Sequence, residues 1–226
     1  MEGVSLKVAA EAMGGELAMV GDPEIAVTGG VIDSRDVEPG NLFFALGGEQ
    51  TDGHRFVESA LKSGASAAVV ASDWFATADR EKGPLIIVDA PDLAMGDLAR
   101  EYRRRFDIPI VAITGSNGKT TTKDMAASVL STRYEVLATE GNLNTRLGVP
   151  MTLFRLTAAH DVAVIEMGIS EHHGLTYLCE IADPTIGVIT NVGPTHLEFL
   201  GSVEGVAQAK GELLEYLDES SMTILN

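Results

Sequence analysis

A glycine-rich segment that runs into a lysine and three threonines carries the clearest chemistry in the sequence. The apolar run Ile110–Ile113 leads into TGSNGKTTT, and a helical pattern begins at Lys119. In such a segment the glycines let backbone N–H groups converge on phosphate oxygens, while the helix N-terminus and the lysine supply positive charge. We therefore expect a nucleotide-phosphate site. Its residues would be Thr114, Gly115, Ser116, Asn117, Gly118, Lys119, Thr120 and Thr121, with the hydroxyl of Thr120 on Mg²⁺.

The spacing of the glycines departs from the common phosphate-loop pattern G-x-x-x-x-G-K-[ST], because Ile113 stands where the first glycine would be. The alternative is an ordinary glycine-rich turn between a strand and a helix. That alternative leaves Lys119 and the threonines at the helix start without an explanation. We interpret the segment as a shortened phosphate loop.

Three polar residues follow later apolar segments. Glu166 ends the apolar strand that begins at Val162, and a carboxylate at the carboxyl end of a parallel strand could hold Mg²⁺. A solvated acid at the strand end is the alternative. His196 lies in a loop after TNVGPT, and Lys210 lies in a helical segment. Taken alone, a loop histidine and a helix lysine are more often solvated or structural than functional.

From Asp107 onward, strand-like apolar runs alternate with helical patterns. The expected strands are Ile108–Thr114, Glu135–Thr139, Val162–Met167, Thr185–Val192 and Met222–Leu225, and the expected helices are Lys119–Thr132, Asn144–Leu156, His173–Ile181 and Val203–Leu217. This alternation predicts a doubly wound, mainly parallel sheet with helices on both faces. Because the sequence reaches Asn226 in a strand-like segment with no helix after it, we expect 107–226 to be an ATP-binding domain truncated at its C-terminal end.

Residues 1–106 combine short apolar runs with a helical pattern at Phe56–Ser63, which indicates a small N-terminal α/β domain. A helix over Leu93–Phe106 closes it. We expect Arg103, Arg104 and Arg105, near the end of that helix, to complement the helix dipole in solvent.

The overall composition excludes several classes of protein. The 226 residues carry a formal net charge of −17, which argues against a general nucleic-acid binder, and 45% are hydrophobic, which argues against global disorder. The single cysteine, Cys179, cannot form an intramolecular disulfide. No apolar run approaches the roughly 20 residues of a membrane span. We expect a cytoplasmic monomer that binds neither nucleic acid nor membrane.

Together these motifs resemble the ATP-dependent Mur ligases of cell-wall precursor synthesis. The segments that carry the resemblance are ITGSNGKTTTKDM, EGNLNTRLGVPMTLFRL, VIEMG, ITNVGPTHLEFLGS and AQAKGELL, and DSRDVEPGNLFFALGGEQTDGHRFVESALKSGASAAVV is similar to the UDP-binding domain of that family. The resemblance extends from about Leu6 to Asn226 and is closest to the branch that adds D-alanyl-D-alanine. It implies a further C-terminal domain, which is absent from this sequence.

The resemblance implies roles for the matching residues. Lys119 would contact the β/γ phosphates of ATP. Thr120 and Glu166 would hold a first Mg²⁺, and His196 and Lys210 would hold a second, with Lys210 converted to a carbamate because a bare ammonium cannot ligate Mg²⁺. The residues that would bind substrate are Ser34, Arg35, Asp52, Gly53 and His54 for the UDP group, and Asn142 and Asn144 for the UDP-linked peptide and its acyl phosphate.

Two of these assignments have a structural alternative, and one segment departs from the family. An Asx-type turn before Phe56 explains Asp52 and His54 equally well. His172 and His173, in the departing segment ISEHHG, are expected at a solvated helix start and not as metal ligands.

The implied reaction is ATP-dependent amide formation. ATP would phosphorylate the terminal carboxylate of a UDP-N-acetylmuramoyl-tripeptide, and the amine of D-Ala-D-Ala would attack the acyl phosphate. We expect this chain alone to be catalytically incomplete. The alternatives are a ligase that adds the third stem residue, a folylpolyglutamate synthase, and a non-catalytic module that binds UDP-muramoyl peptide and nucleotide. The GNLNTRLGVP segment and the DSR-led N-terminal segment argue against the folate enzyme.

Overall fold

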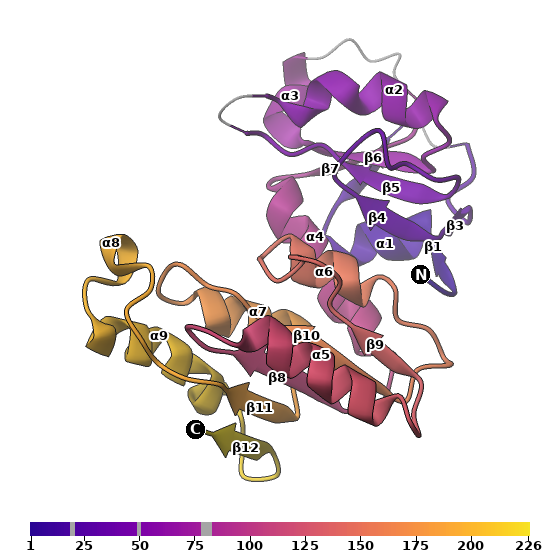
Figure 1. The fold of residues 1–226 in the computed structure, drawn as a ribbon. Helices are drawn as coiled ribbons and strands as arrows, with labels where there is room; N and C mark the ends of the chain where they lie inside the picture. The colour runs from indigo at the N-terminus through magenta and orange to yellow at the C-terminus, as the bar shows by residue number, and fades with distance from the viewer. Residues whose placement is uncertain (19–20, 49–50, 78–82) are drawn as a thin grey trace. The chain divides into compact units, whose positions relative to one another are not determined.

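The computed structural model describes residues 1–18, 21–48, 51–77 and 83–226, which form two compact units, Met1–Tyr102 and Arg103–Asn226. Both units are α/β (Figure 1). In the described part of the chain, no helix combines the length and the apolar character needed to cross a membrane.

The N-terminal unit contains a five-stranded sheet in the order β2-β7-β6-β5-β4, parallel except for the β2–β7 pair, and a small β1–β3 pair. Its strands are β1 (Val4–Ser5), β2 (Glu16–Ala18), β3 (Ala26–Val27), β4 (Gly29–Val31), β5 (Asn41–Phe44), β6 (Ala67–Ala71) and β7 (Leu85–Val88). Its helices are α1 (Leu6–Ala12), the 3₁₀ turn η1 (Gly53–Phe56), α2 (Val57–Lys62), α3 (Ser72–Thr77) and α4 (Pro91–Arg103).

The central strands of this sheet are apolar on both faces because helices cover both (Figure 1). Phe43 and Val70 pack with α2 and α3 in one core cluster, and residues on the other side of the pleat, such as Phe44, are equally buried. A strand that is buried on both sides has a continuous apolar sequence without alternation.

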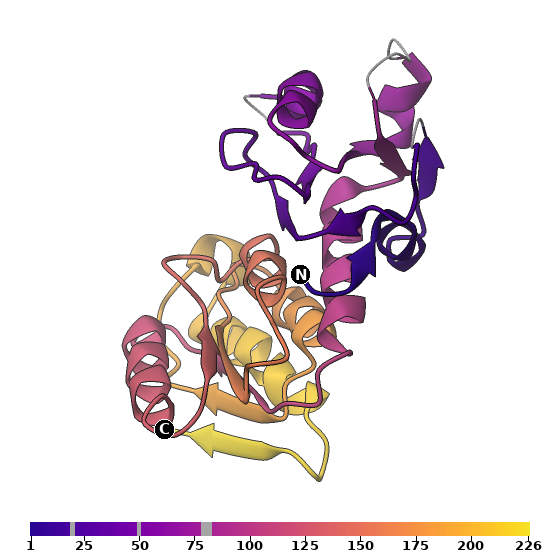
Figure 2. The same cartoon turned by 90° about the vertical axis from the view of Figure 1, so that its right-hand side faces the viewer.

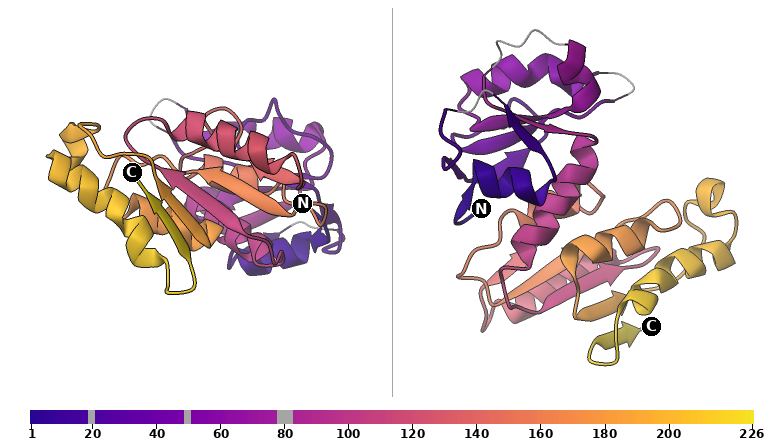
Figure 3. Two further views of the ribbon diagram at one scale, coloured as in Figure 1. Left: turned by 60° about the horizontal axis from the view of Figure 1, so that its bottom comes forward. Right: turned by 180° about the vertical axis from the view of Figure 1, so that it is seen from behind.

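The C-terminal unit is a doubly wound parallel sheet in the order β12-β11-β8-β10-β9, so the expected fold class is confirmed. Its strands are β8 (Ile110–Thr114), β9 (Val136–Ala138), β10 (Val162–Glu166), β11 (Ile186–Ile189) and β12 (Met222–Leu225). Its helices are α5 (Lys119–Leu130), α6 (Gly148–Leu153), α7 (Gly174–Ala182), α8 (Leu197–Leu200) and α9 (Val203–Tyr216). Helix α5 covers one face of the sheet, and α7 and α9 lie side by side on the other (Figures 2 and 3).

This topology determines where ligands can bind. β8 is central, and the chain leaves it first toward β9 and β10 and later returns on its other side as β11. Open α/β sheets bind ligands at such a switch point, at the carboxyl ends of the strands. The phosphate loop follows β8, Glu166 ends β10, and the segment with His196 follows β11.

Helix α4 ends at Arg103 and not at Phe106. Three elements of the C-terminal unit also differ from the expectation. α6 begins at Gly148 and not at Asn144, because Asn144 is engaged at the end of β10: its carbonyl accepts a 2.7 Å bond from Gly168 N–H. β11 ends at Ile189 and not at Val192, because the following residues contact the phosphate loop. The short helix α8 was not expected.

The expectation for Arg103 is wrong. Its side chain is buried, and Nε donates to Ala182 O at 2.7 Å while Nη2 donates to Asp183 O at 3.0 Å. These are backbone carbonyls at the C-terminal end of α7, where a helix leaves its last acceptors unsatisfied. Arg103 thus caps α7, whereas Arg104 and Arg105 are exposed as expected.

Candidate functional site

The phosphate loop joins β8 to α5 through two glycines with positive φ. Gly115 has a φ of 147°, and a Cβ there would lie 1.9 Å from Thr190 Oγ1. Gly118 has a φ of 80° and is the residue before α5. Lys119 folds back over the loop, and its Nζ donates to Gly115 O at 2.9 Å. The backbone geometry that the sequence indicated is therefore present.

The loop is held by the segment that follows β11. Ser116 Oγ accepts from Gly193 N–H at 2.9 Å, and Thr190 Oγ1 donates to Asn117 O at 2.6 Å. The Asn117 N–H donates to Asn191 Oδ1 at 2.9 Å. The segment that leads to His196 and the phosphate loop are thus linked by several hydrogen bonds. His196 itself is exposed, has a φ of 52°, and precedes α8.

Glu166 is buried at the end of β10 with only 1% of its surface exposed. Asn144 Nδ2 donates to Oε1 at 2.7 Å, and the Glu166 N–H donates to Thr139 Oγ1 at 2.9 Å. Oε2 has no hydrogen-bond partner within the described residues. A buried carboxylate oxygen without a partner is costly unless a cation binds it, so this oxygen fits a divalent metal ion.

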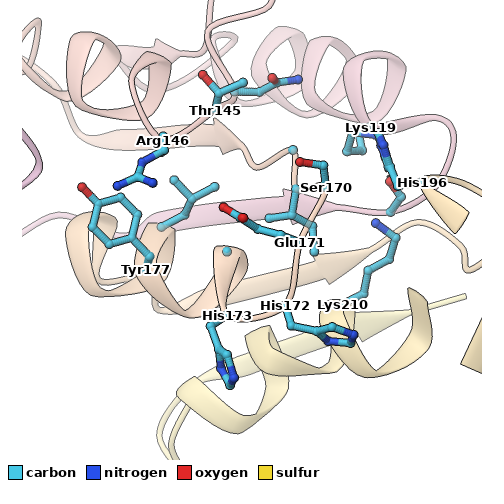
Figure 4. Close-up of a pocket in the computed structure, with 16 residues that line it drawn as sticks. Lys119, Thr145, Arg146, Ser170, Glu171, His172, His173, Tyr177, His196 and Lys210 are labelled. Carbon is cyan, nitrogen blue, oxygen red and sulfur yellow. Dashed lines mark hydrogen bonds between the residues drawn. The ribbon is translucent and has the colours of Figure 1, made fainter. Parts of the chain in front are cut away.

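Lys210 is buried on α9, with 3% of its surface exposed. In Figure 4 its amine points from α9 toward Lys119 and His196. No described residue forms a hydrogen bond or ion pair with this amine. Burial, and secondarily the positive charge of Lys119, lowers the pKa of Lys210 to about 8. The expectation of a solvated lysine, drawn from the residue alone, does not hold.

Lys119, His196 and Lys210 converge on one cleft of about 790 Å³. Its lining is made of Gly115, Lys119, Asn144, Thr145, Arg146, Gly168, Ile169, Ser170, Glu171, His172, His173, Gly174, Tyr177, Leu178, His196 and Lys210. Glu166 lies behind Asn144 and outside this lining. Thr120, Thr121 and Asn142 are exposed and also lie outside it. The described residues contain no cluster of three or more His, Cys, Asp or Glu side chains that could hold a metal ion.

Glu212 is a residue that sequence reasoning missed. Its buried carboxylate accepts from the N–H groups of His173, Leu175 and Thr176 at 2.7, 3.2 and 3.0 Å. It thereby caps α7 from α9, the helix that carries Lys210. Nothing in the local sequence signals this contact, because the partners lie more than 30 residues away.

Arg146 and Tyr177 were also missed as site residues. The guanidinium of Arg146 lies over the Tyr177 ring, 5.2 Å from its centroid. Both residues line the cleft at the end away from Lys119 and Lys210 (Figure 4). His172 and His173 are exposed and directed away from Lys119, in agreement with a solvated helix start.

In the N-terminal unit the expected UDP-binding residues follow neighbouring parallel strands. Ser34 and Arg35 follow β4, and Asp52–His54 follow β5, so both groups leave the sheet at its carboxyl edge. The exposed Arg35 is paired with Asp33, and hydrogen bonds from Arg35 lower the pKa of Asp33 to about 2.

Asp52 and His54 form the Asx turn that the sequence left open. Asp52 Oδ1 accepts from the His54 backbone N–H at 3.0 Å. This bond, together with the hydrogen bond to the His54 imidazole ring, lowers the pKa of Asp52. His54 Nδ1 lies 2.6 Å from Asp52 Oδ1, and Nε2 accepts from Ala71 N–H at 3.1 Å. The ring therefore donates from Nδ1 and stacks on Trp74, with 4.9 Å between centroids.

Comparison of the chain with known protein families supports the phosphate-loop and UDP-domain interpretation. Residues 113–226 match the Mur ligase middle domain, and residues 26–103 match the catalytic domain of the Mur ligase family. The chain belongs to the Mur ligase family. The resemblance that the motifs carry is thereby confirmed.

Among relatives of this Mur ligase chain, the UDP-N-acetylmuramoyl-tripeptide–D-alanyl-D-alanine ligase of Bacillus subtilis is 39% identical over 220 residues, which cover 97% of this chain and 48% of that protein. The UDP-N-acetylmuramoylalanyl-D-glutamyl-2,6-diaminopimelate–D-alanyl-D-alanyl ligase of Acinetobacter baumannii superposes with a TM-score of 0.86 at 32% identity, covering 97% of this chain and 48% of that one. MurF of Thermotoga maritima in complex with ADP gives a TM-score of 0.76 at 32% identity, covering 87% and 45%. This chain spans about half the length of these relatives.

Proposed function

We propose that this chain carries the UDP-substrate and ATP-phosphate sites of a ligase that joins D-Ala-D-Ala to UDP-N-acetylmuramoyl-tripeptide. The observation that carries the proposal is the convergence of Lys119, His196 and Lys210 on one cleft beside the unpartnered oxygen of Glu166. The similarity to D-Ala-D-Ala ligases over nearly the whole chain supports the substrate assignment.

The proposed reaction has two steps. A terminal carboxylate oxygen of the tripeptide attacks the γ-phosphorus of ATP, the bond to the β-phosphate oxygen breaks, and ADP leaves. The amine of D-Ala-D-Ala then attacks the acyl carbon, an amide bond forms, and phosphate leaves while the nitrogen loses a proton. Because carboxylate and triphosphate repel one another, the role of Lys119 is to neutralise charge where they meet.

Mg²⁺ fits this site. Thr120 and Glu166 would hold one ion, and His196 and Lys210, as a carbamate, would hold a second. The ions would supply further neutralisation of the phosphate oxygens. An amine without an acidic partner suits carbamate formation, in which the neutral nitrogen adds to CO₂ and releases a proton; the lowered pKa of Lys210 increases the neutral fraction.

We assign residues 1–106 to UDP-substrate binding and residues 107–226 to ATP. Ser34, Arg35 and Gly53 would contact the UDP group directly. Asp52 and His54 would form the turn at the carboxyl edge of the N-terminal sheet, since His54 already has a protein partner at each ring nitrogen. Asn142 and Asn144 would reach the peptide end of the substrate. Because UDP-linked substrates and ATP are cytoplasmic metabolites, we also propose a cytoplasmic enzyme, and a monomer.

Calorimetric titration tests this assignment. The chain should bind UDP-N-acetylmuramoyl-tripeptide and Mg·ATP, and the full gene product should release phosphate only when D-Ala-D-Ala is also present. Lys119→Ala should abolish that release, whereas Lys7→Ala, at an exposed site on α1, should not. Unchanged turnover in Lys119→Ala would contradict the phosphate-loop assignment. Binding of both ligands without phosphate release in the gene product would instead favour a binding module.

A further inference from the structure

A carboxylate and an amide meet at the carboxyl end of β10. Asn144 Nδ2 donates to Glu166 Oε1 at 2.7 Å, and Glu166 Oε2 has no hydrogen-bond partner among the described residues. We propose that Asn144 is a positioning residue for the first Mg²⁺, because its amide holds one oxygen of Glu166 and leaves the other for the ion. This inference rests on the proposed function and adds to it the residue that orients the carboxylate.

The backbone around Glu166 is fixed by two buried threonines. The Glu166 N–H donates to Thr139 Oγ1 at 2.9 Å, just after β9, and Met167 O accepts from Thr114 Oγ1 at 2.9 Å, at the end of β8. Glu166 itself has only 1% of its surface exposed. With the backbone held on both sides, the freedom that remains is rotation of the carboxylate side chain. A hydrogen bond to one carboxylate oxygen removes that freedom.

The amide of Asn144 is itself held in place. The Asn144 N–H donates to Asn142 O at 2.8 Å, and Asn144 O accepts from Gly168 N–H at 2.7 Å. Gly168 also packs against the face of the amide, since a Cβ there would lie 3.1 Å from Asn144 Cγ and Oδ1 and 3.3 Å from Nδ2. The amide plane is therefore set by the protein. The contact with Glu166 uses one N–H group, so it is compatible with the substrate contact proposed above for Asn144.

A neutral donor suits this role better than a charged one. Lysine or arginine beside Glu166 would neutralise the carboxylate and compete with the metal ion for it, whereas an amide orients the carboxylate and leaves its negative charge. The partner of this carboxylate in the described part of the chain is the neutral amide of Asn144. The buried oxygen without a partner carries a desolvation cost, and binding of a cation offsets that cost.

Titration of the chain with ATP, once with Mg²⁺ and once with EDTA, tests the role of Asn144. The ratio of the two affinities measures what the metal ion contributes, and the affinity in EDTA measures the contacts that need no metal. Asn144→Leu keeps the approximate size of the side chain and removes the donor. We expect it to lower the ratio roughly 10-fold and to leave the affinity in EDTA unchanged, because loss of a group that orients a metal ligand weakens the metal and not the nucleotide contacts.

A double variant separates an action through Glu166 from a direct contact with the nucleotide. Glu166→Gln should lower the ratio at least as far as Asn144→Leu does. Combining the two changes should lower the ratio no further, because Asn144 then has no carboxylate to orient. Arg155→Gln, an exposed change outside the cleft lining, is the matched control and should keep the wild-type ratio.

Three results overturn the positioning role. They are a wild-type ratio in Asn144→Leu, an equal loss of affinity with and without Mg²⁺ in that variant, and a double variant whose ratio falls below that of Glu166→Gln. If Asn144→Leu does not fold, Asn144→Ala is measured in its place with the same expected ratio. A wild-type chain that binds ATP equally well in Mg²⁺ and in EDTA overturns this role together with the metal site, and one that binds no ATP overturns the proposed function itself.

Discussion

Burial changes the chemistry of a single lysine in this molecule. On an exposed helix Lys210 would be a permanent cation. Here α9 places its amine inside the cleft facing Lys119, and both the loss of hydration and the like charge disfavour the protonated form. A neutral amine is a nucleophile, and this is the property that carbamate formation requires.

The shifted pKa of Lys210 predicts a pH dependence of stability. Between about pH 8, where folded Lys210 titrates, and about pH 10.4, where an unfolded lysine titrates, the unfolded chain binds the extra proton. The free energy of unfolding should therefore rise with pH across this window in the wild type relative to Lys210→Met. Urea unfolding in CO₂-free buffer measures the difference. Lys7→Met, at an exposed site, should follow the wild-type profile, and identical profiles for Lys210→Met and wild type would contradict the burial effect.

Alanine substitutions at Gly115 and Gly118 allow the cost of a steric clash to be compared with the cost of backbone strain. Ala at Gly115 adds a Cβ 1.9 Å from Thr190 Oγ1 at a φ of 147°, whereas Ala at Gly118 meets nothing within 4 Å at a φ of 80°. We expect Gly115→Ala to lower the free energy of unfolding by roughly 2–4 kcal/mol and Gly118→Ala by about 1 kcal/mol. Thermal unfolding of both variants checks this. Equal losses would mean that Thr190 moves aside.

At the scale of elements, two side chains fix the two ends of α7. Glu212 caps its N-terminus from α9, and Arg103 caps its C-terminus. Helix ends carry unsatisfied backbone groups, and here charged side chains satisfy them inside the protein. The orientation of α7, and of the cleft residues that it carries, therefore depends on both caps.

Removing the charge of Glu212 should loosen the N-terminal cap. In Glu212→Gln one carboxylate oxygen is replaced by an amide NH₂ group, which cannot accept hydrogen bonds from the N–H groups of Leu175 and Thr176. We expect the free energy of unfolding to fall by about 1–3 kcal/mol. Glu215→Gln, an exposed change on the same helix, is the matched control and should change little. Equal stability of both variants in urea would show that water replaces the cap.

Arg103→Met should loosen the opposite end of α7. It leaves the carbonyls of Ala182 and Asp183 without their buried donor, and we expect a loss of about 2–3 kcal/mol. Hydrogen exchange should quicken at the end of α7 in this variant. The exposed neighbour Arg104→Met serves as control, and a similar loss there would assign the effect to net charge.

The sequence predicts the elements whose signals are local and misses those whose causes are distant. The strand, loop and helix around Lys119 were located correctly because apolar periodicity and glycines are local properties. Arg103 bonds to residues 79 and 80 positions away, and the partners of Glu212 lie 36 to 39 positions away. β11 stops early because Thr190 turns to bond to Asn117. No periodic pattern encodes contacts of this kind.

At the scale of the whole chain, the net charge does not indicate the charge of the ligands. The net charge of −17 suggests cationic partners, yet the proposed ligands are anions. The cleft resolves this conflict because its described lining carries one acid beside several cations. A small number of cationic side chains gathered in one cleft is enough to bind a polyanion, and the acidic surface elsewhere repels it.

The two compact units contain one natural probe each, which allows their ligands to be assigned separately. The single tryptophan, Trp74, lies in the N-terminal unit, and the single cysteine, Cys179, is buried in the C-terminal unit. A ligand at about 100 times its Kd adds about 2.7 kcal/mol to the unit that binds it, which moves a urea midpoint by roughly 1–2 M.

Mg·ATP should therefore delay the exposure of Cys179 to a thiol reagent without moving the Trp74 fluorescence transition, and UDP should do the reverse. Burial raises the pKa of Cys179 to about 12, so its reaction in the folded unit is slow and its labelling reports unfolding. Lys119→Ala should lose the ATP effect and keep the UDP effect. If either ligand moves both transitions equally, the units unfold together and the separate assignment of the two sites has to rest on variants alone.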